Sequence, residues 1–533
     1  MTAPLASATT IRNPVLKGFN PDPSILRVGD DYYLATSTFE WFPGVQIHHS
    51  RDLANWRLLT RPLDRPSQLD MVGNPDSGGV WAPCLSHAGG LFWLVYTDVK
   101  YWKRDPYKIA HNYLVTSPSI EGPWSEPVFM NSSGFDPSLF HDDDGRKWLL
   151  NMEWDHRKQN NRFSGILLQE FCAETMSLVG PVKRIFKGTE RGLVEGPHLY
   201  KRNGWYYLLT AEGGTQYAHA ATLARSRTID GPYELHPQKH LLSSYEHREA
   251  ELQKAGHASL LETQMGEWFL AHLCGRPIDG EHCILGRETA IQKCTWDADD
   301  WLYLEQGGTS PALNTKGPSG LPEAPCPEVG WDGNFDRPQL DLHFQSLRQP
   351  VSEDWLSLTE RPGYLRLKGM EPTVSTFRQS LIARRVQSFD ISAETSVEFE
   401  PETFQQMAGL IAYYDTENHY YLRLSLDDEL GRTLNIIATD AATSCEVLED
   451  EVQVPATGAI SMRLTLKGAA LQFEFSDPGG EWTKIGPVLN GAILSDDYNH
   501  LGFTGAFVGL CCQDISGRKR HADFGCFVYR ENA

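Results

Sequence analysis

The sequence predicts an all-β protein in which a five-bladed β-propeller is followed by an antiparallel β-sandwich. Three observations support this fold class. A phrase of turn residues followed by aromatic and aliphatic residues occurs five times, beginning at Gly29, Gly90, Gly145, Gly204 and Gly266. A matching strand precedes each copy at a nearly constant step along the chain. Beyond residue 331, short runs alternate apolar and polar residues.

The repeated phrase has the composition of the second strand of a β-hairpin. The strands upstream of the five copies align in one column as Asp22-Pro-Ser-Ile, Ala82-Pro-Cys-Leu, Asp136-Pro-Ser-Leu, Gly196-Pro-His-Leu and His257-Ala-Ser-Leu. Neighbouring members of this column lie 54 to 61 residues apart. One four-stranded blade needs about this length of chain, so we expect five blades closed in a ring over residues 1–305.

The chain changes character after the fifth repeat. Residues 306–331 are rich in Gly, Pro, Ser and Thr, which predicts an ordered linker. From 332 to 533, runs such as 420–425 and 471–475 alternate apolar and polar residues between turns, as the strands of a sandwich do. Two domains are expected in any case, because 533 residues exceed what one hydrophobic core usually serves.

Composition and charge exclude several classes of partner. Acidic residues outnumber basic ones by 69 to 48, and the net charge of −21 repels nucleic acid and anionic membrane surfaces. No stretch approaches the roughly 20 apolar residues of a membrane span, and residues 1–11 lack a secretory signal pattern. Ten cysteines without CxxC pairs predict reduced thiols and a cytoplasmic protein. The 11% aromatic content suits surfaces that stack on sugar rings, as well as an aromatic core.

Acidic residues stand at or beside the column positions of three blades. The innermost strand of each blade faces the central channel, so Asp22, Asp136 and Glu195 are expected to share one cavity. Asp-Pro-Ser alone is a common turn phrase, and only the joint placement in an internal repeat indicates function. Like charges at short range move pKa values upward and apart, which holds one carboxyl protonated beside an ionised one. Glycoside hydrolysis needs such an acid and base.

The other two blades place Trp81 and His257 at the same level of the channel. Trp81 suits a sugar platform at the channel mouth, and simple packing is the alternative. His257 has no Cys or His neighbour at metal-ligand spacing. It is expected either as a structural histidine or as one that binds water or a cation near the axis.

Three phrases surround the acidic positions: Gly-Phe-Asn-Pro-Asp-Pro-Ser at 18–24, Gly-Phe-Asp-Pro-Ser-Leu-Phe at 134–140 and Val-Glu-Gly-Pro-His-Leu-Tyr at 194–200. Together with further phrases at 37–45, 79–83, 285–289 and 503–509, in this order, they resemble glycoside hydrolase family 43, and most closely its two-domain β-xylosidases. The resemblance covers almost the whole chain. It implies that the sandwich is of the concanavalin, lectin-like kind and closes one end of the active-site pocket.

The resemblance also implies roles for matching positions. Asp22 would be the general base that takes a proton from the attacking water, and Glu195 the general acid that protonates the departing oxygen. Asp136 would raise the pKa of Glu195 and orient it. Arg287 would contact the substrate and face the carboxylates, where a guanidinium can make forked hydrogen bonds.

The same resemblance implies the substrate and the outcome of the reaction. Phe39, Trp81 and Phe507 would line the subsite for the non-reducing end, with His257 also near the substrate. A pocket closed at one end cleaves one sugar at a time, which implies release of D-xylose from β-1,4-xylo-oligosaccharides. Direct attack by water inverts the anomeric configuration and requires carboxyls ~6.5 to 9.5 Å apart. No cofactor is expected apart from a water-coordinated Ca²⁺ near His257 in the channel, and a homo-oligomer is expected.

Three alternatives are to be weighed at this stage. An α-L-arabinofuranoside presents hydroxyls much like those of a β-D-xylopyranoside, so arabinofuranosidase activity can accompany or replace xylosidase activity. A five-bladed enzyme of the invertase type would carry Asn-Asp-Pro-Asn and Glu-Cys motifs, and neither occurs. A non-catalytic carbohydrate-binding propeller would leave three converging carboxyls without a purpose.

Overall fold

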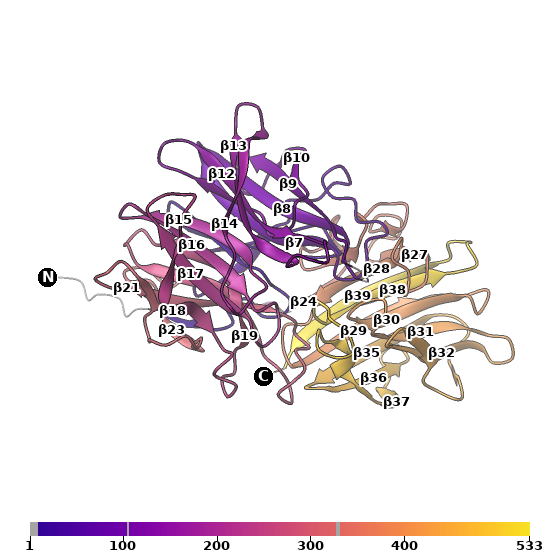
Figure 1. Ribbon diagram of the computed structural model, residues 1–533. Helices are drawn as coiled ribbons and strands as arrows, with labels where there is room; N and C mark the ends of the chain where they lie inside the picture. The colour runs from indigo at the N-terminus through magenta and orange to yellow at the C-terminus, as the bar shows by residue number, and fades with distance from the viewer. Residues whose placement is uncertain (1–8, 104–105, 327–330, 533) are drawn as a thin grey trace.

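The computed structural model describes residues 9–103, 106–326 and 331–532, and it is built almost entirely of β-strands (Figure 1). The N-terminal part forms five four-stranded sheets around a common axis, and the C-terminal part forms two larger sheets. The predicted propeller followed by a sandwich is therefore confirmed. Helical structure in the described ranges is confined to the short 3₁₀ helix η1(Gly491–Leu494). Within them, no helix has the length and apolarity that crossing a membrane requires.

Each blade is a meander of antiparallel strands. Blade one consists of β2(Ser24–Val28), β3(Asp31–Thr36), β5(Gln46–Ser50) and β6(Arg57–Thr60). Blade two consists of β7(Gly79–Ala88), β8(Leu91–Tyr101), β9(Ile109–Ser117) and β10(Val128–Asn131). Blade three consists of β11(Ser138–His141), β12(Lys147–Trp154), β13(Phe163–Cys172) and β14(Ser177–Phe186). Blade four consists of β15(Glu195–Arg202), β16(Trp205–Glu212), β17(Ala220–Ser226) and β18(Glu234–Ser243). Blade five consists of β19(Gln253–Glu262), β20(Trp268–Gly275), β21(Glu288–Trp296) and β22(Leu302–Leu304).

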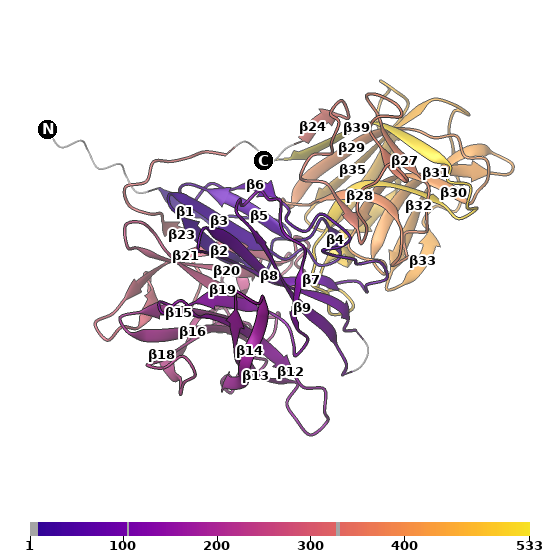
Figure 2. The same ribbon diagram turned by 90° about the horizontal axis from the view of Figure 1, so that it is seen from above.

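The first strands of the blades form the inner ring. Strand β2 contacts β7, β7 contacts β11, β11 contacts β15, β15 contacts β19, and β19 contacts β2 again. A short antiparallel pair between β1(Thr10–Arg12) and β23(Asn314–Lys316) lies beside blade five. The segment predicted as a linker thus contributes a strand, and this strand holds the beginning of the propeller chain against its end (Figure 2).

The sequence repeat specifies two backbone positions in every blade. The glycine that opens each phrase lies in the hairpin turn with a φ between 63° and 90°, a region that L-residues rarely adopt. The five column residues, which lie just before or within the first half of the inner strands, also have positive φ, between 35° and 56°: they are Asp22, Ala82, Asp136, Gly196 and His257. Such backbone costs of the order of 1–3 kcal/mol for each non-glycine residue, and it concentrates at functional sites. The repeat therefore places local strain around the channel.

The sandwich consists of two antiparallel sheets. The first contains β24(Trp331–Asn334), β26(Leu356–Ser357), β27(Leu365–Lys368), β29(Asp390–Glu398), β35(Ala459–Lys467), β36(Ala470–Ser476), β37(Thr483–Asn490) and β39(His521–Glu531). The second contains β4(Trp41–Phe42), β25(Gln345–Leu347), β28(Ser380–Arg385), β30(Gln406–Tyr413), β31(His419–Asp427), β32(Gly431–Asp440), β33(Thr443–Glu446), β34(Val452–Gln453) and β38(Phe507–Asp514).

The two sheets differ in burial because the second faces the propeller. Strands β29 and β35 of the first sheet alternate buried and partly exposed residues, as the sequence pattern predicts for a sheet with one solvated face. Strands β30 and β38 of the second sheet are buried along nearly their whole length. The second sheet therefore has one face in the sandwich core and the other against the propeller.

A piece of the propeller chain belongs to the second sheet of the sandwich. Strand β4, which follows the first hairpin of blade one, pairs with β25 through Phe42–Ser346 and Trp41–Leu347 (Figure 2). Trp41 also stacks on Phe507, with ring centroids 3.8 Å apart. Aromatic pairs of this kind add about 0.5–1.5 kcal/mol to the free energy of burial alone. The two domains are thus joined by strand pairing as well as by side-chain packing.

A buried ion pair also joins the domains. Arg348, which follows β25, is 1% exposed and donates from Nη2 to the Asp76 Oδ1 of blade two at 2.6 Å. Its Nε donates to the carbonyl oxygen of Asn74 at 2.7 Å. Thr416 of the sandwich donates to the other oxygen of Asp76. Both charges are therefore matched, and neither partner can be removed without leaving the other buried.

Replacing Arg348 should destabilise the interface between the two domains. We expect Arg348→Met to lower the free energy of unfolding by about 3–5 kcal/mol, because the buried Asp76 loses its hydrogen-bonded cation and keeps only the more distant Lys103, 3.9 Å away. The measurement is urea denaturation followed by fluorescence. Arg51→Met is the matched control, since Arg51 pairs with Asp31 at the surface and should cost at most about 1 kcal/mol. Equal losses in the two variants would show that the interface pair has no special weight.

Candidate active site

The three predicted carboxyls converge at one level of the propeller channel. Asp22, Asp136 and Glu195 are between 5% and 8% exposed. The charges of Asp22 and Glu195 both act on Asp136, and the charge of Asp22 acts on Glu195. Blades one, three and four contribute one carboxyl each, as the repeat predicts.

Asp22 has the surroundings of a carboxylate. Arg287 Nη1 donates to its Oδ1 at 2.8 Å, and the hydroxyl of Ser37 donates to its Oδ2 at 2.6 Å. His257 Nδ1 lies 3.5 Å from Oδ1. Ser37 in turn accepts a hydrogen bond from the backbone N–H of Ala82, so blade two helps to hold the group. An ionised carboxyl accepts hydrogen bonds at both oxygens, which is the arrangement found here.

Glu195 is held in its protonated form. Burial, followed by the negative charge of Asp22, raises its pKa to about 8. The cations of Arg287 and Lys108 act in the opposite direction and lower the pKa. The balance leaves a carboxylic acid at neutral pH, which can give a proton to a neighbouring oxygen.

Asp136 contacts the backbone beside Glu195. Its Oδ2 accepts a hydrogen bond from the N–H of Gly196 at 3.1 Å. Burial, then the charges of Glu195 and Asp22, raise the pKa of Asp136 well above its ordinary value. The principal causes of the raised Glu195 pKa are burial and Asp22, so Asp136 acts on Glu195 through position more than through charge. The buried carboxyls titrate as a coupled group.

Only glycine fits at position 196. A Cβ at this position would lie 2.9 Å from Nε2 of His257, and the backbone φ is +55°. The imidazole thus packs directly on the chain that follows Glu195. Burial lowers the pKa of His257, which keeps the ring neutral. The close approach of blades four and five therefore depends on a glycine opposite a histidine.

The predicted calcium site lacks a protein-based set of ligands. In the described ranges, no group of three or more His, Cys, Asp or Glu residues is arranged to hold a metal ion, and His257 belongs to none. Calcium prefers six to eight oxygen ligands, so an ion beside His257 would depend mainly on water. The residues present fit such an ion poorly.

Aromatic rings form one wall beside the carboxyls. Phe39 and Trp81 lie with ring centroids 5.9 Å apart, and Trp81 lies 5.3 Å from Phe135. The Arg287 guanidinium is 5.3 Å from the centre of the Phe39 ring. Phe39 and Trp81 thus lie where the family resemblance places them, adjacent to the residues around Asp22.

The predicted position of Phe507 is wrong. Its ring has no exposed surface and stacks on Trp41 behind the aromatic wall. The sandwich residue that reaches the wall is Phe503, whose ring lies 5.8 Å from Phe39 and 5.4 Å from Trp81. Phe507 lies on a strand, β38, whose register points its ring into the domain interface, whereas Phe503 precedes the strand and is free to turn toward the channel.

Sequence analysis missed three residues that complete the site. Ser37 and Phe503 stand inside phrases that resemble the family, so a signal existed, although it did not distinguish them from their neighbours. Lys108 stands outside the repeated phrases, and no signal indicated it. Its Nζ lies 4.5 Å from the centre of the Trp154 ring, and burial lowers its pKa to about 8.

Arg287 connects the base to the second domain. Nη1 bonds Asp22, and Nη2 donates to the carbonyl oxygen of Phe503 at 3.0 Å. A β-propeller that buries a guanidinium-bound carboxylate and a protonated carboxyl in one channel, closed by an aromatic from a second domain, is a glycoside hydrolase. Residues 11–302 match the model of glycosyl hydrolases family 43, and residues 332–530 match the β-xylosidase C-terminal concanavalin A-like domain. The chain belongs to glycoside hydrolase family 43.

Similar proteins match along their whole length. Xylosidase/arabinosidase 43B of Humicola insolens is 54% identical over 98% of this chain and 97% of its own. A β-xylosidase of Bacillus subtilis is 52% identical over 98% of this chain and 99% of its own. The crystal structure of a xylan β-1,4-xylosidase from Bacillus halodurans C-125 superimposes with a TM-score of 0.96 at 56% identity, covering 98% of this chain and 100% of that one.

The raised pKa of Glu195 predicts a pH-dependent cost to stability. The ordinary value of 4.5 rises to about 8 in the fold, so the proton stabilises the folded state. This contribution is fully present below the ordinary pKa and is lost as the pH rises through about 8. Glu195→Gln cannot ionise, and we expect it to have a higher thermal midpoint than the wild type at about pH 9, with a much smaller difference at about pH 5.

Calorimetric scans at both pH values test this expectation. Glu121→Gln, at an exposed turn, is the control and should follow the wild type at both. A midpoint difference for Glu195→Gln that stays constant between the two pH values would contradict the raised pKa.

Proposed function

We propose that the protein is an exo-acting, inverting β-xylosidase that releases D-xylose from the non-reducing ends of β-1,4-xylo-oligosaccharides. The principal support is one observation: the guanidinium-bound carboxylate of Asp22 and the protonated Glu195 occupy the same buried channel. Full-length relatives named as xylosidases support the choice of sugar. The charge of −21 suits a neutral sugar, with no nucleic acid or membrane partner.

The reaction is a single displacement at the anomeric carbon. Asp22 takes one proton from a water molecule as the water oxygen bonds to that carbon. The glycosidic bond breaks on the opposite face, and Glu195 gives its proton to the departing oxygen. Asp136 keeps Glu195 in place through the Gly196 N–H. The geometry requires a carboxyl separation of ~6.5 to 9.5 Å to admit the water.

Exo cleavage follows from the closed aromatic end. Phe39, Trp81 and Phe503 lie within 6 Å of one another by ring centroids and surround the Arg287 side of the channel. One sugar ring fits against such a wall, and longer chains must extend the other way. Lys108, whose charge acts on Glu195, has its Nζ 5.5 Å from the centre of the Trp81 ring, so it lies between the acid and the aromatic wall.

An α-L-arabinofuranosidase is the second candidate. The Humicola insolens relative is named as both a xylosidase and an arabinosidase. The two aryl glycosides should be compared by kcat/KM under identical conditions, together with xylobiose. A higher kcat/KM for the arabinofuranoside than for the xyloside would make this second activity the principal one.

We further propose that no cofactor is needed, that the protein is cytoplasmic, and that it forms a homo-oligomer. The ten cysteines, all without a disulfide partner in the described ranges, suit a reducing compartment. Activity after dialysis against a chelator tests the first proposal, and any Ca²⁺ in the channel would appear there as a loss. Light scattering tests the oligomeric state.

Stereochemistry tests the mechanism directly. Hydrolysis of an aryl β-xyloside followed by proton NMR should show α-xylose as the first product, because water attacks the face opposite the leaving group. The β anomer should appear only later, through mutarotation. First-formed β-xylose would instead mean a covalent intermediate and would rule out Asp22 as a base.

Variants separate the acid from the base. Asp22→Ala and Glu195→Ala should each lower kcat by roughly two or more orders of magnitude. The loss in Glu195→Ala should be much smaller on an aryl glycoside with a good leaving group, which needs no proton. Asp22→Ala should lose activity equally on both substrates, and it serves as the matched comparison. If both variants respond to the leaving group in the same way, Glu195 is not the acid.

A further inference from the structure

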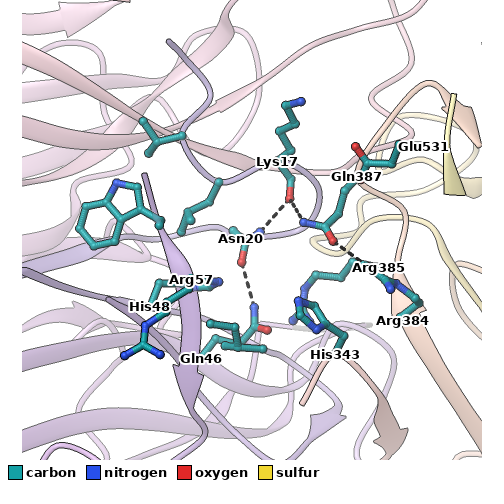
Figure 3. A pocket seen from close by; sticks show the side chains of 14 residues that line it. Lys17, Asn20, Gln46, His48, Arg57, His343, Arg384, Arg385, Gln387 and Glu531 are labelled. Carbon is teal, nitrogen blue, oxygen red and sulfur yellow. Dashed lines mark hydrogen bonds between the residues drawn. The ribbon is translucent and has the colours of Figure 1, made fainter. Parts of the chain in front are cut away.

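A second cavity, of about 390 Å³, lies where the propeller meets the sandwich (Figure 3). None of the three catalytic carboxyls lines it. Both domains contribute cationic or titratable side chains: Lys17, His48 and Arg57 come from the propeller, and His343, Arg384 and Arg385 from the sandwich. The only acidic residue in the lining is Glu531, which is exposed. This local concentration of positive charge contrasts with the net charge of −21 for the whole chain.

Arg385 is a deeply buried cation in this cavity. It is 5% exposed, and its guanidinium lies between the rings of Phe19 and Phe507, 5.3 Å from the centre of each. Nε donates to the Phe19 carbonyl oxygen and Nη1 to the Gln345 side chain, both neutral acceptors. Nη2 has no partner. Within the described part of the chain, no carboxylate forms an ion pair with this arginine.

His48 presents a second unpartnered nitrogen. The side chain is 8% exposed, and its Nδ1 is buried without a hydrogen bond. The neighbouring Arg61, which is 6% exposed, bonds only the Leu342 carbonyl oxygen and leaves Nη1 without a partner. His343 pairs with Asp341 at 2.8 Å, so that carboxylate is already engaged.

Uncompensated charge at this depth is unfavourable. An isolated buried ion loses far more hydration energy than two neutral hydrogen bonds return. Burial and the neighbouring Arg61 and Arg384 lower the pKa of Arg385 well below its ordinary value, which expresses the same cost. Arg385 lines the cavity and keeps one donor without a hydrogen-bond partner, and its forked guanidinium is the kind of group by which arginine binds carboxylate and phosphate.

We propose that this interdomain cavity binds a small oxyanion, either inorganic phosphate or a dicarboxylate, through Arg385 and His48, and that the bound anion holds the sandwich against the propeller. The anion supplies the missing countercharge and accepts the free N–H groups. Lys17 and Arg57 at the rim, both exposed, attract it from solvent. Because the lining comes from two domains, binding stabilises the docked arrangement and not either domain alone.

Titration with defined anions tests the proposal. Wild-type protein is studied by isothermal titration calorimetry and thermal unfolding with phosphate, with succinate, and with chloride at matched ionic strength. Saturable heat and a rising thermal midpoint are expected with phosphate or succinate but not with chloride. The anion that binds with the lower dissociation constant, phosphate or succinate, identifies the class of ligand. Absence of saturable binding by both would overturn the proposal.

Variants assign the binding to the cavity. Arg385→Met should weaken binding at least about tenfold, as expected for a lost charged hydrogen bond. Lys17→Gln combined with Arg57→Gln, both at exposed positions, should weaken it without disturbing the fold. Arg432→Met is the matched control, because Arg432 is a buried arginine of the sandwich that also bonds only carbonyl oxygens and lies outside the cavity.

A competition experiment tests whether the anion and the sugar bind at different sites. Saturating xylose should leave phosphate affinity unchanged, since no catalytic carboxyl lines the cavity. Displacement of phosphate by xylose, or equal weakening in Arg432→Met and Arg385→Met, would show that the anion binds elsewhere and would refute the proposal.

Discussion

Three buried carboxyls share the channel with Arg287, the one Arg or Lys among the described residues that forms a hydrogen bond with any of them, and the other features of the site follow from this shortage of positive charge. Arg287 pairs with Asp22, whereas the pKa values of Glu195 and Asp136 are raised by burial and by neighbouring negative charge. The same guanidinium bonds the Phe503 carbonyl of the sandwich. One side chain thereby sets the protonation pattern and attaches the second domain to the base.

The backbone around the channel is strained in a repeated way. All five column positions have positive φ, although only Gly196 is a glycine. Left-handed backbone turns the chain sharply near the start of each inner strand, and Asp136 there accepts a hydrogen bond from the N–H of Gly196, which follows Glu195. A closed ring of contacting inner strands supplies the packing that tolerates such strain.

The sandwich contributes residues to the active site. Strand β38 of its second sheet is buried along its whole length, the same sheet includes β4 of the propeller chain, and the segment before β38 places Phe503 at the aromatic wall. Buried charges at the interface follow two patterns. Arg348 has Asp76 as a countercharge, whereas Arg385 bonds neutral acceptors beside an open cavity. The contrast between these arginines is the reason for proposing an anion at the second position.

The sequence alone determined the repeat, the fold class and the three carboxyls. Each blade is a set of local hairpins, so its turn glycines and strand starts recur at a fixed spacing, and a shared spacing implies a shared axis. Only the tertiary structure decided that Phe503 and not Phe507 faces the channel, that Ser37 and Lys108 complete the site, and that β4 joins the sandwich. These features depend on strand register and on contacts between different blades and domains, which no local pattern records.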